Sequence, residues 1–197
     1  MNAAATEWRS EIDSASRRLD GRNGHFLLET PLWKLPAAAF GLNSAPGVEI
    51  WLKLEHLQVG GSFKARGMMN RLLTHTIPAS GVVVASGGNA GIATAAAAQA
   101  LGVRCEVFLP GVSPEAKRAK LRALGAQVTV VGDMYAQALA ACLARQAETG
   151  ALLTHAYDQP EVVAGAGTLG REIEQQGGLP DAALVSVGGG GLLGGPA

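Results

Sequence analysis

The 197-residue sequence predicts an α/β fold in which parallel strands alternate with helices. Three observations predict this fold class. Short apolar runs such as GVVVAS, at 81–86, alternate along the chain with longer stretches that have helical patterns. No linker or low-complexity segment interrupts that alternation. Hydrophobic residues make up 48% of the chain and charged residues only 16%, so a substantial core can be buried.

The predicted elements follow one another in a regular order. The segment 30–40, TPLWKLPAAAF, is predicted to be extended because two prolines punctuate it. Strands are predicted at 48–56, 81–86, 104–110, 126–132, 151–156 and 182–187, the last running into a glycine loop. Helices are predicted at 7–20, 63–75, 92–101, 113–125, 134–148 and 160–176. Ser62 and Ser113 are expected to cap two of these helices, with Pro114 and Gly125 at the start and end of the second.

Charge and cysteine content exclude several classes of function. The 16 basic and 16 acidic side chains give a formal net charge of zero and form no basic stripe, so nucleic acid is not expected as a partner. Cys105 and Cys142 lack metal-ligand spacing, and two unpatterned cysteines fit a reducing cytoplasm. The first residues lack the apolar core of a signal peptide, and no apolar run is long enough to span a bilayer. We therefore expect a cytoplasmic protein without a metal site or a membrane partner.

The stretch GGSFKARG, at 60–67, places Lys64 at the start of a predicted helix. The helix dipole disfavours positive charge there, so the location suits a lysine that works as a neutral amine. Together with partial burial, this location would lower the pKa of Lys64 and favour nucleophilic chemistry. The simpler alternative is a solvated lysine in the first helical turn. Lys53, in the middle of a predicted strand, is expected at a sheet surface.

Two glycine loops follow predicted strands, at the edge where parallel sheets bind ligands. Gly188 to Leu192, GGGGL, can direct backbone N–H groups at a phosphate, and a tight packing turn is the alternative. Ser86 to Asn89, SGGN, can hold a carboxylate, and a helix cap is the simpler interpretation. The pattern G-x-G-x-x-G at 165–170 follows a helix, and at 189–194 it lacks the later acidic residue, which argues against dinucleotide binding.

A reactive lysine, a carboxylate loop and a phosphate loop are the parts that pyridoxal phosphate chemistry requires. On these residues the chain resembles the fold-type II pyridoxal-phosphate enzymes, which are tryptophan synthase β-like, and within them the threonine/serine dehydratase (ammonia-lyase) group. The matching stretches occur in family order and cover nearly all of residues 30–195: TPL, KLEHLQVGGSFKARG, ASGGNAG, FLPGVSPEAKRAKLRALGAQV, YDQPEVVAGAGTLGREI and VSVGGGGLL.

The resemblance implies a role for each residue of the candidate site. Lys64 would form the Schiff base with pyridoxal 5′-phosphate, Phe63 would pack beside the cofactor ring, and Asn89 would hydrogen-bond the phenolic oxygen of the cofactor. The substrate carboxylate would bind the loop formed by Ser86, Gly87, Gly88 and Asn89. The cofactor phosphate would bind the loop formed by Gly188, Gly189, Gly190, Gly191 and Leu192.

The resemblance also implies two parallel-sheet α/β domains with the cofactor in the cleft between them. Residues 1–55 and 151–197 would form the large cofactor domain, and residues 56–150 the small domain. The implied reaction is β-elimination of L-threonine or L-serine to a 2-oxo acid and ammonia, with Lys64 as the base that removes the α-proton. The expected partner is a small amino-acid substrate, and the question of whether the chain forms a homodimer is left open.

Three positions narrow the branch of the family that the chain resembles. Ala65 follows the Schiff-base lysine where cysteine and threonine synthases usually carry an acid, so β-replacement is less expected. Gly87 stands where serine racemases have a second serine, which favours elimination over racemisation. Ala166 stands where many dehydratases have glutamine, which leaves the choice between threonine and serine open.

The end of the sequence carries a further expectation. Members of the resembled family continue well past the phosphate loop, whereas this sequence stops at residue 197. We therefore expect a truncated chain that binds cofactor weakly and turns over little. The alternative from a different functional class is a catalytically inactive or ligand-binding fragment.

Overall fold

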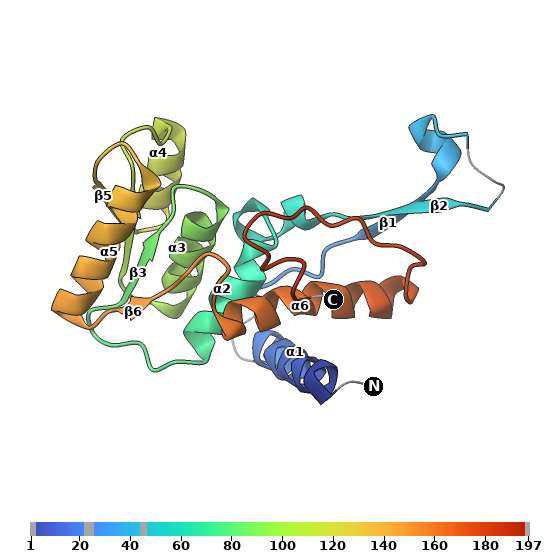
Figure 1. The fold of residues 1–197 in the computed structure, drawn as a ribbon, viewed down its shortest axis with the longest axis horizontal. Helices are drawn as coiled ribbons and strands as arrows, with labels where there is room; N and C mark the ends of the chain where they lie inside the picture. The colour runs from blue at the N-terminus through green and yellow to red at the C-terminus, as the bar shows by residue number, and fades with distance from the viewer. Residues whose placement is uncertain (1–2, 22–25, 44–46, 196–197) are drawn as a thin grey trace.

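The computed structural model describes residues 3–21, 26–43 and 47–195. Its elements fall into two groups, with the helix α2 (Lys64–Leu73) between them (Figure 1). One group is a four-stranded sheet with helices packed on it, and the other contains a two-stranded sheet and two long helices. The remaining α-helices are α1 (Ala3–Gly21), α3 (Asn89–Leu101), α4 (Glu115–Ala123), α5 (Tyr135–Thr149) and α6 (Pro160–Gly177).

The four-stranded sheet is parallel throughout and has the strand order β5-β4-β3-β6. Its strands are β3 (Val82–Ala85), β4 (Cys105–Leu109), β5 (Gln127–Val130) and β6 (Leu152–Leu153). The predicted parallel α/β fold is therefore confirmed. The strand predicted at 151–156 is only two residues long, because β6 pairs with β3 only at Val82 and Val83.

Alternate side chains of β3 enter two separate cores. Val82 and Val84 pack with residues of α2, α3 and α4, whereas Val83 and Ala85 pack with a cluster that includes Cys142 of α5. Because the side chains of a strand alternate between its two faces, helices must cover both faces of this sheet. This double cover explains why every residue of β3 is buried and why its sequence is uniformly apolar.

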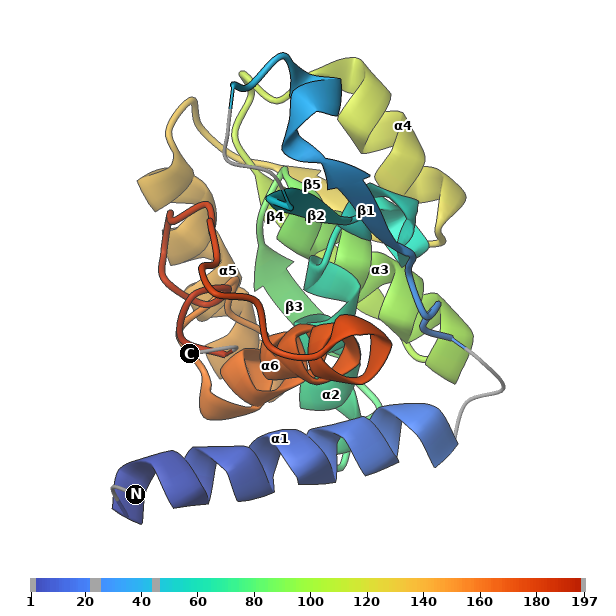
Figure 2. The same ribbon diagram turned by 90° about the vertical axis from the view of Figure 1, so that its right-hand side faces the viewer.

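The helix α2 is fixed by close packing against α6 and α3. A Cβ on Gly165 of α6 would lie 2.7 Å from the Cα of Gly67, and a Cβ on Gly67 would lie 2.6 Å from the carbonyl oxygen of Val162. Only glycines allow the two helices to approach so closely. The helix α1 lies along α2 and α6 (Figure 2) and buries Ile12 and Ala15. This packing holds the start of α2, where Lys64 lies, in a defined place.

A second, antiparallel sheet extends away from the first (Figure 1). It consists of β1 (Leu32–Pro36) and β2 (Glu49–Lys53), with Lys34 opposite Trp51. The Lys34 Nζ lies 3.8 Å from the centroid of the Trp51 ring, which allows a cation–π contact. The segment 30–40, predicted to be extended, thus contains a strand followed by a 3₁₀ helix (Ala37–Phe40).

The two predicted serine caps are wrong. Phe63 occupies the N-cap position of α2, Pro114 occupies that of α4, and neither helix start has a side-chain cap hydrogen bond. Ser62 is instead extended and buried, and Ser113 lies in the turn before α4. Gly125 does follow the end of α4 with a φ of 78°, which is the left-handed conformation that glycine adopts most readily.

Residues 182–187 are not a strand, contrary to the sequence prediction. The side chains of Leu184 and Val187 are exposed rather than buried in a sheet. A strand needs a neighbouring strand for its backbone hydrogen bonds, and in the described part of the chain none lies beside this segment. Across the same described residues, every helix is too short or too polar to cross a bilayer.

Candidate active site

Three of the loops at the carboxyl edge of the four-stranded sheet concern the candidate site. They follow β4, β3 and β6, and they comprise residues 110–114, 86–88 and 154–159. The carboxyl ends of parallel strands share one edge, which is where open α/β sheets bind ligands. The helix α2 brings Lys64 to the last of these loops, because the Lys64 Nζ donates a hydrogen bond of 2.5 Å to the backbone oxygen of Ala156.

Lys64 is a half-buried amine. It is the first residue of α2, as the sequence predicted, and burial lowers the pKa of its side chain. A lower pKa raises the neutral fraction of the amine, and only the neutral form acts as a nucleophile or base. The Lys64 Nζ also lies 4.9 Å from the centroid of the Phe63 ring. This environment suits the predicted role of Lys64 better than that of a solvated surface lysine.

The loop Ser86 to Asn89 joins β3 to α3, as predicted. The Ser86 hydroxyl accepts a hydrogen bond of 3.2 Å from the Gly88 N–H, and it keeps its own hydrogen to donate. Asn89 is the first residue of α3 and has an exposed side chain. The following residue, Ala90, packs in one cluster with Met68 of α2 and Ala156. The loop Ser86 to Asn89 therefore lies close to the segment that Lys64 contacts.

The glycine loop packs on a tyrosine that follows β6. A Cβ on Gly189 would overlap the Tyr157 ring, and a Cβ on Gly191 would lie 2.9 Å from the Tyr157 Cβ. Positions 188 and 190 face open space, and Gly190 has a φ of 85°. Leu192, the last residue of the loop, is half-buried. Two of the four glycines are thus required for packing, and the other two leave backbone open to a ligand.

The segment 155–158 connects Lys64 with the glycine loop. The His155 Nδ1 accepts hydrogen bonds from the backbone N–H groups of Tyr157 and Asp158, and the His155 and Tyr157 rings meet edge to face at 4.7 Å. Ala156 accepts the Lys64 bond while Tyr157 supports the glycines. No pattern in the sequence marked Ala156, because a backbone oxygen can bind from any residue type.

A buried charge cluster is centred on Arg66, two residues after Lys64. Arg66, which is 1% exposed, forms hydrogen-bonded ion pairs with Glu55 at 2.8 Å and with Glu172 at 2.6 Å. Lys53 bonds Glu172 at 2.6 Å and has a side chain only 7% exposed, so its predicted place at a sheet surface is wrong. Burial would raise the pKa of the Glu172 carboxyl, but the bonds and charges of Arg66 and Lys53 outweigh burial and lower it.

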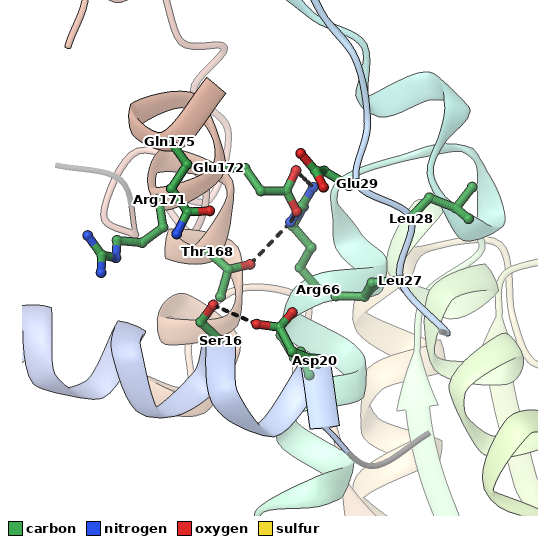
Figure 3. Close-up of a pocket in the computed structure, with 11 residues that line it drawn as sticks. Ser16, Asp20, Leu27, Leu28, Glu29, Arg66, Thr168, Arg171, Glu172 and Gln175 are labelled. Atoms are coloured by element: carbon green, nitrogen blue, oxygen red, sulfur yellow. Dashed lines mark hydrogen bonds and ion pairs between the residues drawn. The ribbon is translucent and has the colours of Figure 1, made fainter. Parts of the chain in front are cut away.

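Beside Arg66 lies a cavity of about 390 Å³. It is lined by α1, α2, α6 and residues 27–29, and Figure 3 shows Asp20, Glu29, Glu172 and Arg171 around it. Lys64 and the two glycine loops do not line it. The cavity is therefore separate from the candidate site, although Arg66, one of its lining residues, lies two positions after Lys64 in α2.

The residues at the site fit a cofactor with a reactive carbonyl, an aromatic ring and a phosphate. The Lys64 amine lies beside the Phe63 ring, and the glycine loop leaves two positions open toward space. The adjacent Ser62 hydroxyl is buried without a hydrogen-bond partner among the described residues, which leaves it free for a ligand group. The same part of the chain contains no group of three or more His, Cys, Asp or Glu side chains that could hold a metal ion.

Comparisons with known proteins also lead to a pyridoxal-phosphate cofactor. A family model described as "Pyridoxal-phosphate dependent enzyme" matches residues 25–197. The chain is 43% identical to an L-threonine ammonia-lyase of Thermotoga maritima over 158 residues, which are 78% of this chain and 39% of that protein.

Two solved structures are similar to the chain. A threonine deaminase from T.th. matches with a TM-score of 0.83 and 39% identity, over 94% of this chain and 58% of that one. A pyridoxal 5′-phosphate-dependent aspartate racemase matches with a TM-score of 0.86 and 32% identity, over 95% of this chain and 57% of that one. The chain thus spans well under two thirds of the length of each of these proteins.

Proposed function

This chain belongs to the family of pyridoxal-phosphate dependent enzymes, and we propose that it binds the cofactor through Lys64 and deaminates L-threonine or L-serine by β-elimination. The products are a 2-oxo acid and ammonia. The chain matches proteins named threonine ammonia-lyase or threonine deaminase over 78% and 94% of its length, which supports this substrate class.

One observation carries the proposal. The Lys64 amine is half-buried, has a lowered pKa and donates to the Ala156 oxygen at the carboxyl edge of the sheet. A lysine in this state can bond to the cofactor carbonyl and later take a proton as a neutral amine. A lysine solvated at a helix start would have none of these three properties.

Lys64 and the two glycine loops have separate roles in the proposed reaction. When bound, pyridoxal phosphate supplies an electron sink for negative charge at the substrate Cα. The Lys64 amine takes the α-proton, while the Ala156 oxygen holds one of its hydrogens and so orients its lone pair. The loop Ser86 to Asn89 binds the substrate carboxylate, and the loop Gly188 to Leu192 binds the phosphate at its open glycines.

Racemisation is the second candidate function, because one similar structure is an aspartate racemase at 32% identity. Both reactions begin with removal of the α-proton, and they differ in whether the proton returns to the other face or the β-group leaves. The product analysis below separates the two.

The test maps the cofactor lysine. The chain is incubated with saturating pyridoxal phosphate, reduced with borohydride, digested and analysed by mass spectrometry. We expect the pyridoxyl group on Lys64 and its loss in Lys64→Arg, with Lys117→Arg, an exposed residue of α4, as matched control. A pyridoxyl group on another lysine, or on none, contradicts the proposal. The same samples are then assayed for 2-oxo acid, ammonia and D-amino acid from L-threonine and L-serine.

A further inference from the structure

Gly87 and Ser113 come from different loops but share one space. A Cβ on Gly87 would lie 2.7 Å from the Ser113 Oγ and 3.5 Å from the Ser113 Cβ. The first separation is shorter than real Cβ atoms show, whereas the second is an ordinary van der Waals contact. The Ser113 hydroxyl therefore occupies the place that a side chain at position 87 would fill.

The backbone of Gly87 gives no other reason for a glycine. Its φ is not positive, unlike that of Gly102 or Gly125, so a left-handed backbone is not the reason for glycine here. Its remaining near contact, the Cβ of Leu109 at 3.6 Å, is an ordinary one. Room for the Ser113 hydroxyl is thus the one steric requirement that the structure shows for glycine at this position.

The location of the Ser113 hydroxyl suits ligand binding. Ser113 follows β4 and Gly87 follows β3, which are neighbours in the sheet, so both lie at its carboxyl edge. Ser113 is half-buried, and its backbone N–H is held by the Pro110 oxygen, which fixes the turn. Its hydroxyl makes no hydrogen bond to the described residues, so it has both a hydrogen to donate and lone pairs to offer.

We propose that the Ser113 hydroxyl, which lies beside Gly87, binds the substrate. It donates a hydrogen bond to the carboxylate of the amino acid that the loop Ser86 to Asn89 holds. The inference rests on the proposed function, which places the carboxylate at that loop. Ser113 adds to the loop a hydroxyl that the loop itself lacks at position 87. Charge-assisted hydrogen bonds of this kind are among the stronger ones in proteins.

The first arm of the test measures the contact without cofactor, by thermal unfolding. Gly87→Ala places a methyl group against the Ser113 Oγ and lowers Tm, and adding Ser113→Ala removes the clash and restores much of the loss. Tm effects of the two substitutions that simply add would show that the side chains do not share this space.

The second arm measures the affinity of the cofactor-loaded protein for L-threonine, by spectroscopic titration. Ser113→Ala weakens binding by about tenfold, as expected for one hydrogen bond to a charged group. Ser10→Ala, an exposed residue of α1, is the matched control and leaves the affinity unchanged. The double variant Gly87→Ser with Ser113→Ala, called the swap, places the hydroxyl on the loop after β3 in place of the loop after β4. We expect its affinity for L-threonine to be within about threefold of the original, because the same hydrogen bond is regained.

The outcomes separate this inference from the proposed function. If the unmodified protein binds cofactor and L-threonine but Ser113→Ala binds equally well, or if the swap stays as weak as Ser113→Ala, the role of Ser113 is overturned and the proposed function stands. If the unmodified protein takes no cofactor on Lys64, the proposed function is overturned and this inference falls with it.

Discussion

Replacing Arg66 with methionine tests whether the buried charge cluster stabilises the fold around Lys64. The substitution keeps an unbranched apolar stem but removes the guanidinium that bonds Glu55 and Glu172. The side chains of Glu55 and Glu172 are 13% and 19% exposed. Without Arg66, Glu172 still has its ion pair with Lys53, whereas Glu55 loses the ion pair with Arg66. Buried carboxylates without their partner are strongly unfavourable.

The expected cost follows from that burial. Breaking a buried ion pair by removing one partner costs about 3–5 kcal/mol. Partial exposure of both carboxylates lets water return to them, which places Arg66→Met near the lower end, at roughly 3 kcal/mol. For a chain of this size, each kcal/mol shifts Tm by about 2–4 °C, so Tm should fall by roughly 6–12 °C.

The assay is thermal unfolding at neutral pH, followed by circular dichroism. Arg104→Met is the matched control, because Arg104 is exposed, and it should change stability by less than about 0.5 kcal/mol. Adding Glu55→Gln and Glu172→Gln to Arg66→Met removes the unpaired charges and should recover part of the loss. A Tm for Arg66→Met within about 2 °C of the original chain would refute this reasoning.

Four further outcomes are expected. The folded-state pKa of Glu172 lies below its ordinary value of 4.5, so its ion pairs contribute stability that is present above pH 4.5 and is lost as pH falls through the folded-state pKa. Glu172→Gln should therefore make stability depend less steeply on pH in this acidic range. An unchanged pH dependence would contradict the lowered pKa of Glu172. Gly189→Ala, which drives a methyl group into the tyrosine ring beneath the loop, should weaken pyridoxal phosphate binding at least tenfold more than Gly188→Ala, which faces open space, as an equilibrium titration of both variants will show. Burial raises the pKa of Cys105 and Cys142 to about 12, so iodoacetamide at pH 8 should alkylate both far more slowly in the folded chain than in guanidinium, and equal rates would count against their burial. Incubation of the loaded protein with L-serine should release 2-oxo acid and ammonia, whereas D-serine as the main product would establish racemisation instead.

Local patterns in the sequence were enough to predict most of the elements. The alternation of apolar runs with helical stretches predicted the parallel sheet, and the apolar run at 81–86 was correctly predicted as a short buried strand. The stretch GGSFKARG placed Lys64 at a helix start, and SGGN was correctly placed between β3 and α3. These predictions succeeded because turn chemistry, periodicity and backbone preference act over a few neighbouring residues.

Predictions that depended on distant partners succeeded less often. The run at 182–187 has the apolar composition of a strand, yet a strand forms only beside another strand. Lys53 has the sequence context of a sheet surface, yet Glu172 of α6, 119 residues away, lies against it and turns it into a buried ion pair. Neither outcome can be deduced from residues nearby in the chain.

The sequence by itself determined most of the elements, the family resemblance and the candidate lysine. The tertiary structure alone decided that Ala156 holds the Lys64 amine, that Tyr157 supports the glycine loop and that the Ser113 hydroxyl fills the space beside Gly87. The physical reason is that each of these contacts joins segments that are not neighbours in the sequence. The sheet order β5-β4-β3-β6 brings the loops of Gly87, Ser113 and Ala156 to one edge, and the packing of α2 brings Lys64 there. A hydrogen bond or a steric overlap depends on distances of a few ångströms, and chain folding sets those distances between residues far apart in sequence.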